Sequence, residues 1–111
     1  MRPESKKLLE DMRRASSSIA KIVLGRTIEQ FRAEQELRWA VERGFEIVGE
    51  ALSQLRKIDP SLAESITDWR AIIGFRNVLI HGYSVVDADK TWDIASNELP
   101  ILITQIEQLL R

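Results

Sequence analysis

The sequence lacks several residue types, and each absence excludes a class of site. There is no cysteine among the 111 residues, so disulfides, thiolate metal ligands and cysteine nucleophiles are excluded. His81 is the only histidine, and no carboxylate stands near it at the spacing of a metal site. We therefore expect no metal and no other cofactor.

An excess of one charge and long apolar runs are also missing. The chain has 16 lysines and arginines against 17 aspartates and glutamates, so its formal net charge is −1. A protein that coats a nucleic-acid duplex is usually basic, so any contact with nucleic acid must be local. The apolar runs are short, and the start of the chain has no signal-peptide pattern. We expect no membrane contact and a cytoplasmic location in a bacterium or archaeon.

Apolar residues recur at steps of three and four, the spacing of amphipathic helices. One helix is predicted over residues 5–24 and ends at Gly25, which suits a left-handed cap. Thr27 offers the next cap, and a long helix is predicted over residues 33–57. Ser61 is expected to cap a short turn after that helix.

The last third of the chain predicts two more helices. Asp87 or Asp89 can cap the first, and Pro100 should interrupt it because proline removes a backbone donor. Asn97 is then the expected cap of the final helix. No strand is predicted, so residues 1–111 should form one all-α domain, an antiparallel four- to five-helix bundle.

The stretch between them, residues 69–83 (WRAIIGFRNVLIHGY), differs from the other helices. Wound at about 100° per residue, it is apolar nearly all round, which predicts burial on more than one side. We expect a helix that starts after Thr67 or Asp68 and ends at Gly82. Arg76 falls in the middle of its most apolar face, where an unpaired charge is expensive to bury.

Three polar side chains near the end of this helix form a candidate site. Asn77 and His81 are four residues apart and share one helical face, whereas Arg76 and His81 are about 140° apart. Arg76 and His81 converge only if the arginine wraps, if the helix opens at Gly82, or if a second copy contributes. A structural reading also stays open, with His81 as a helix C-cap and Arg76 paired with a glutamate, either Glu46 or Glu50.

RNA cleavage without a metal requires three chemical groups. A base takes the 2′-hydroxyl proton, an acid protonates the leaving 5′-oxygen, and positive charge stabilises the phosphate. One chain has only one histidine. A two-fold dimer that pairs the helices of residues 69–83 would supply two histidines and two arginines, and it would cover leftover apolar surface.

The string W-R-x-I-I-G-x-R-N-V-L-I-H-G-Y resembles the signature of the HepT-like branch of the HEPN superfamily. These proteins are small all-α dimeric ribonucleases with an R-x4-6-H motif. In this branch the motif is R-x4-H-x-Y, and Arg76, His81 and Tyr83 match its fixed positions. The segment IVGEAL at residues 47–52 and the NELP…QIEQLL tail also resemble the family.

The resemblance implies the toxin of a toxin–antitoxin pair, a metal-independent endoribonuclease with a composite active site at the homodimer interface. Arg76 and His81 would be catalytic, and Asn77 would orient them. An MntA-like nucleotidyltransferase antitoxin would inactivate the toxin by AMPylation of Tyr83, because a bulky anion blocks the cleft. After Tyr83 the chain has Ser84 and Val85, where relatives often have an aromatic residue and a glycine.

Two other functions remain open. The same cleft suits a non-catalytic accessory subunit that binds a nucleotide or phosphate on a nucleotidyltransferase. The third possibility is a purely structural bundle, in which replacement of Arg76 by methionine would be tolerated or stabilising.

Overall fold

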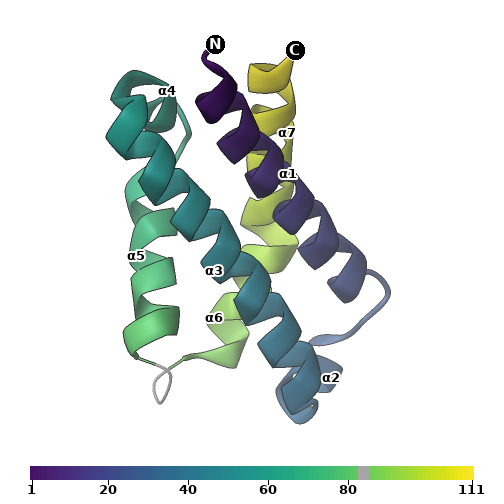
Figure 1. Cartoon of the computed structure of the whole chain (residues 1–111). Coiled ribbons are helices and arrows are strands. Elements are labelled where there is room, and N and C mark those ends of the chain that lie inside the picture. Colours follow the sequence, from purple (N-terminus) through teal and green to yellow (C-terminus); the bar gives the residue numbers. More distant parts are fainter. Residues whose placement is uncertain (83–85) are drawn as a thin grey trace.

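In the computed structural model, which describes residues 1–82 and 86–111, four long helices alternate in direction and place both termini at one end (Figure 1). They are α1 (Pro3–Val23), α3 (Gln35–Ile58), α5 (Trp69–His81) and α7 (Leu99–Leu110). The short elements are α2 (Ile28–Ala33), α4 (Pro60–Glu64), α6 (Ala88–Asp93) and the π-helical turn η2 (Ile94–Glu98). Those residues include no strand, so the all-α bundle is confirmed.

The predicted cap at Thr27 is confirmed. The Thr27 hydroxyl accepts a hydrogen bond from the Gln30 backbone N–H at 3.2 Å, and the Thr27 N–H donates to Gln30 Oε1 at 2.9 Å. This capping box satisfies two donors that a helix start leaves unpaired. Glu34 then separates α2 from α3, so the long helix begins two residues later than predicted.

The predicted cap at Ser61 is wrong. Asp59 caps α4, and its Oδ1 accepts a hydrogen bond from the Leu62 N–H at 3.4 Å. Proline is favoured at the first helical position because its missing N–H would have no partner there. Pro60 takes that position, so the cap has to be the residue before it.

The predicted cap at Asn97 is also wrong, because the chain passes from α6 through η2 into α7. The Asn97 amide donates to Asp93 Oδ1 at 2.6 Å, and the Leu99 N–H bonds to the carbonyl of Ile94. That bond spans five residues, which is the spacing of a π-helix. Pro100, which has no N–H to donate, follows directly in the first turn of α7.

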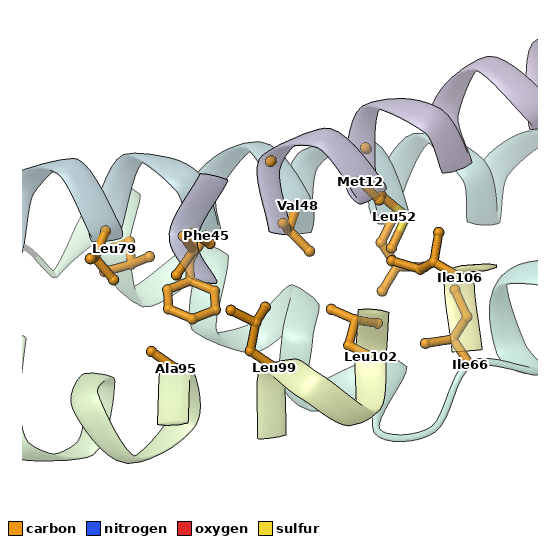
Figure 2. Close-up of a cluster of buried hydrophobic side chains, with 14 of the residues drawn as sticks. Met12, Phe45, Val48, Leu52, Ile66, Leu79, Ala95, Leu99, Leu102 and Ile106 are labelled. Atoms are coloured by element: carbon orange, nitrogen blue, oxygen red, sulfur yellow. The ribbon is translucent and has the colours of Figure 1, made fainter. Parts of the chain in front are cut away.

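The core lies between the four long helices, where α3 packs on α1 and α5, and α7 packs on α1. α3 packs on α1 along one side and on α5 along another. In Figure 2, Phe45 and Val48 of α3 face Leu99 and Leu102 of α7 across the core. All four of these side chains are buried. The long amphipathic helix therefore forms the centre of the bundle.

Helix α5 is less buried than its composition predicts. Leu79 is its one buried residue, while Val78 is 43% exposed and Ile80 is 41% exposed. Within one chain, α3 is the helix that packs extensively against α5, so burial on a second side would require another copy or a partner. Apolar surface is left over on both flanks of α5.

Two glycines of α3 mark the closest approaches of its neighbours. A Cβ atom at Gly44 would lie 2.8 Å from Cδ1 of Ile19 in α1. A Cβ atom at Gly49 would overlap Cβ of Arg76 in α5 and lie 2.8 Å from its Cγ. At both points the helices meet closely because the glycine has no side chain.

We expect Gly49→Ala to lower the free energy of unfolding by roughly 1–3 kcal/mol, because its methyl group would push α5 away from α3. Gly74→Ala is the control, since a Cβ atom at Gly74 meets nothing within 4 Å. Replacing an open helical glycine by alanine should stabilise by roughly 0.5–1 kcal/mol. Urea unfolding followed by circular dichroism measures the free energy of unfolding of both variants. Effects of the same sign would contradict the close contact between Gly49 and Arg76.

Candidate active site

Arg76 is held between two partners. Its Nη2 donates to Glu50 Oε2 of α3 in an ion pair, and its Nη1 donates to Asn77 Oδ1 at 2.8 Å. The Arg76 side chain is only 23% exposed, and its Nε is buried without a hydrogen-bond partner among the described residues. The cost of placing a charge on the apolar face of α5 is therefore offset by Glu50.

Of the two glutamates predicted as partners of Arg76, Glu50 is the one that pairs with it. A hydrogen bond from Gln54 Nε2 at 3.1 Å, followed by the positive charge of Arg76, holds the pKa of the Glu50 carboxyl below its ordinary value. Partial burial acts in the opposite direction and raises that pKa. Glu50 is thus a carboxylate at neutral pH. The other candidate, Glu46, pairs with Arg43 at 3.2 Å instead.

The tip of Arg76 is drawn toward the face of α5 that carries His81. Asn77 and His81 share that face, both are exposed, and α5 stays helical through His81. Asn77 therefore links Nη1 of Arg76 to that face. About 7.5 Å of helical rise still separates residues 76 and 81. The described residues show no hydrogen bond between Arg76 and His81.

Tyr83, the predicted modification site, lies outside the described residues. Gly82 immediately before it is the C-cap of α5, and its N–H donates to the Val78 carbonyl at 2.7 Å. The predicted end of the helix at Gly82 is therefore confirmed. At the other end Asp68 is the N-cap, in the left-handed conformation that aspartate tolerates.

A groove borders each flank of α5. We call the first the mixed-charge groove; it has a volume of about 570 Å³ and lies over α3, between α1 and Ile80 of α5. Besides the exposed Ile47 and Ile80, it is lined by Asp11, Arg14, Arg43, Glu46 and Glu50. The groove reaches the predicted site through Glu50, which pairs with Arg76.

The second groove separates α5 from α6, η2 and α7, and has a volume of about 920 Å³. Its floor includes Phe45 and Phe75, whose rings meet edge to face at 5.4 Å. We call it the acidic groove, because its charged lining residues are Asp68, Asp87, Asp93 and Glu98, with Lys90 as the one cation.

Within the part of the chain that the structure describes, no three histidine, aspartate or glutamate side chains gather closely enough to hold a metal ion. Over the same residues no helix combines the length and the apolar character needed to cross a membrane. Among the described residues, the charged and titratable side chains of the motif are those of Arg76 and His81, and Glu50 of α3 pairs with Arg76.

Comparison with known proteins assigns the family. The family model described as ribonuclease HepT-like matches residues 12–109. The chain belongs to the HepT-like ribonuclease family. It is 30% identical over 109 residues to a Thermococcus cleftensis protein described as a probable ribonuclease HepT, with 98% of each chain covered. The resemblance seen in the motif is therefore confirmed.

Other relatives of this HepT-like chain are described as candidate RNases. One from Caldanaerobacter subterraneus subsp. tengcongensis is 34% identical over 89 residues, which cover 80% of this chain and 79% of the relative. One from Methanocaldococcus jannaschii is 28% identical over 104 residues, which cover 92% and 93%. No solved structure shows a significant match to the chain. The expected enzyme class, a ribonuclease, is confirmed at the level of the family.

Sequence reasoning missed two residues that position the HepT-like motif. Gly49 lets the stem of Arg76 cross α3, and Gln54 holds the carboxylate that pairs with Arg76. A signal for Gly49 was present, because a glycine stands inside IVGEAL next to the candidate Glu50. Nothing in the local sequence marks Gln54.

Proposed function

We propose that this HepT-like chain is the toxin of a toxin–antitoxin pair, a metal-independent endoribonuclease that acts as a homodimer in the cytoplasm of a bacterium or archaeon. Residues 1–111 would form one HEPN-like domain. The observation that carries the proposal is the Arg76 guanidinium, which Glu50 and Asn77 hold beside the face that carries His81. Family membership supplies the substrate class, RNA.

Arg76 would bind the scissile phosphate and stabilise the negative charge that grows on it. A guanidinium has five N–H donors, and two of them are used by Glu50 and Asn77. The outer donors of its two amino groups can therefore bind phosphate oxygens. Asn77 would orient the arginine, while Glu50 supports it from α3.

His81 would carry out proton transfer. A base accepts the proton of the 2′-hydroxyl as the 2′-oxygen bonds to phosphorus, and an acid gives a proton to the 5′-oxygen as its bond to phosphorus breaks. One His81 cannot hold both protonation states at once. Two copies of this exposed histidine across a two-fold axis would divide the roles.

The mixed-charge groove is the face that we propose for dimerisation. A two-fold interface sets the same surface of both copies against itself, so charges of both signs on that surface can pair across the axis. This groove supplies Arg14 and Arg43 as well as Glu46, beside the exposed apolar Ile47 and Ile80. Pairing of the two α5 helices along the flank that carries Ile80 would bring both copies of the Arg76 motif into one cleft.

The activity of the toxin would be regulated by a nucleotidyltransferase antitoxin of the MntA type that transfers AMP to Tyr83. The phosphate of AMP is an anion, so it would compete with RNA for Arg76. Tyr83 stands two residues after His81 in the sequence.

We expect Arg76→Met and His81→Ala each to reduce RNA cleavage by at least about 100-fold, because each removes a group needed in the transition state. Methionine keeps the stem that covers Gly49, so folding should persist. Arg70→Met is the control, since Arg70 is an exposed arginine of α5 that stacks on Trp69 at 5.0 Å. A fluorogenic RNA measures cleavage in EDTA, and circular dichroism measures folding.

Full cleavage by a folded His81→Ala protein would refute the assignment of His81. If the pure wild-type protein cleaves no RNA but binds a nucleotidyltransferase tightly, the chain is a non-catalytic nucleotide- or phosphate-binding accessory subunit instead.

We expect Ile80→Lys to dissociate the dimer and Val78→Lys to leave it intact, because only Ile80 lines the mixed-charge groove. The two residues are matched controls: both belong to α5, and they are 41% and 43% exposed. Sedimentation equilibrium measures the mass of each variant. A monomeric wild-type protein at all concentrations would contradict dimerisation.

We expect the wild-type protein to gain the mass of one or more AMP groups when it is produced together with its nucleotidyltransferase partner. Tyr83→Phe should remove that gain, because phenylalanine has no hydroxyl to modify. Intact-mass spectrometry measures both proteins. An equal gain on the Tyr83→Phe protein would place the modification on another residue.

A further inference from the structure

The acidic groove is not explained by the proposed ribonuclease site. Its walls are α5 on one side and η2 with the start of α7 on the other. At one end Gln105 of α7 closes it, accepting from the Thr67 N–H at 3.0 Å and donating to the Thr67 hydroxyl at 2.7 Å. These hydrogen bonds give the groove a defined end, so it is not simply a gap between two helices.

Exposed apolar side chains line the acidic groove. Val78 of α5 is 43% exposed and Ile101 of α7 is 58% exposed, and both face the acidic groove. The π-helical turn contributes Ile94 and Glu98 to the same wall. Apolar surface rimmed by charges is typical of a protein-binding site, and π-turns are frequent at functional positions.

The charged residues that line the acidic groove, its rim, indicate which kind of partner can bind there. Four carboxylates and one lysine line the acidic groove. RNA is excluded, because its phosphates would meet these carboxylates. A second copy related by a two-fold axis is disfavoured as well, since the same four carboxylates would face one another.

We propose that the acidic groove is the docking site for a basic amphipathic helix of a partner protein. The apolar face of such a helix would cover Val78 and Ile101, and its lysines or arginines would pair with the rim carboxylates. This is the helix-in-groove mode of recognition. The proposal is independent of RNA cleavage, because it uses the flank of α5 opposite the mixed-charge groove.

The test uses a fluorescent peptide of leucine and lysine, about five helical turns long, with leucines on one face. Fluorescence anisotropy measures its binding to the full-length protein. We expect saturable binding that weakens about tenfold when three rim charges are removed by Asp68→Asn, Asp93→Asn and Glu98→Gln. All three replacements keep the shape of the side chain, and asparagine also tolerates the left-handed backbone of residue 68.

The matched control neutralises three exposed carboxylates outside both grooves, by Glu29→Gln, Glu36→Gln and Glu107→Gln. It changes net charge equally and should bind like the wild type. Val78→Lys should also abolish peptide binding, whereas Ile80→Lys should not. The proposal is overturned if the two triple variants bind equally, if the wild type does not bind, or if Val78→Lys dissociates the dimer, which would identify a second copy as the occupant.

Discussion

The contact between Gly49 and the stem of Arg76 sets the distance between α3 and α5, and the candidate site depends on that distance. Because residue 49 has no side chain, the arginine stem crosses α3 directly and its guanidinium reaches Glu50, the next residue of that helix. Gln54 holds the carboxylate from one turn further along. A packing contact thus also positions a charge.

The pairing of Arg76 with Glu50 also shapes how the site can meet RNA. Glu50 is a carboxylate at neutral pH, so it offsets much of the positive charge of Arg76 while no substrate is bound. An incoming phosphate would share the arginine with this carboxylate rather than find a free cation. This agrees with a chain of net charge −1, whose contact with RNA has to be local.

The two flanks of α5 differ in charge, so each flank suits a different kind of partner. The mixed-charge groove carries both signs and suits a surface that meets its own copy. The acidic groove carries nearly one sign and suits a partner of opposite charge. Since α5 packs mainly on α3, parts of both its flanks stay exposed, and its apolar sequence exceeds what the described residues bury.

The helices could be predicted from the sequence, because their apolar spacing and the capping box at Thr27 depend on residues a few positions apart. The motif could be predicted as well, since Asn77 and His81 share a face of any helix that contains them. The caps predicted at Ser61 and Asn97 were wrong. Pro60 makes Asp59 the cap of α4, and Asn97 lies inside the π-helical turn that leads into α7.

Three features depend on how the helices pack: the glutamate that pairs with Arg76, the distance between α3 and α5, and the residues that line each groove. Glu46 and Glu50 are one helical turn apart and equally suited by type, but Arg43 pairs with Glu46 while Gly49 brings Arg76 to Glu50. The acidic groove joins residues as far apart as Phe45 and Gln105. Helical periodicity relates residues within one helix, whereas these contacts depend on how separate helices pack.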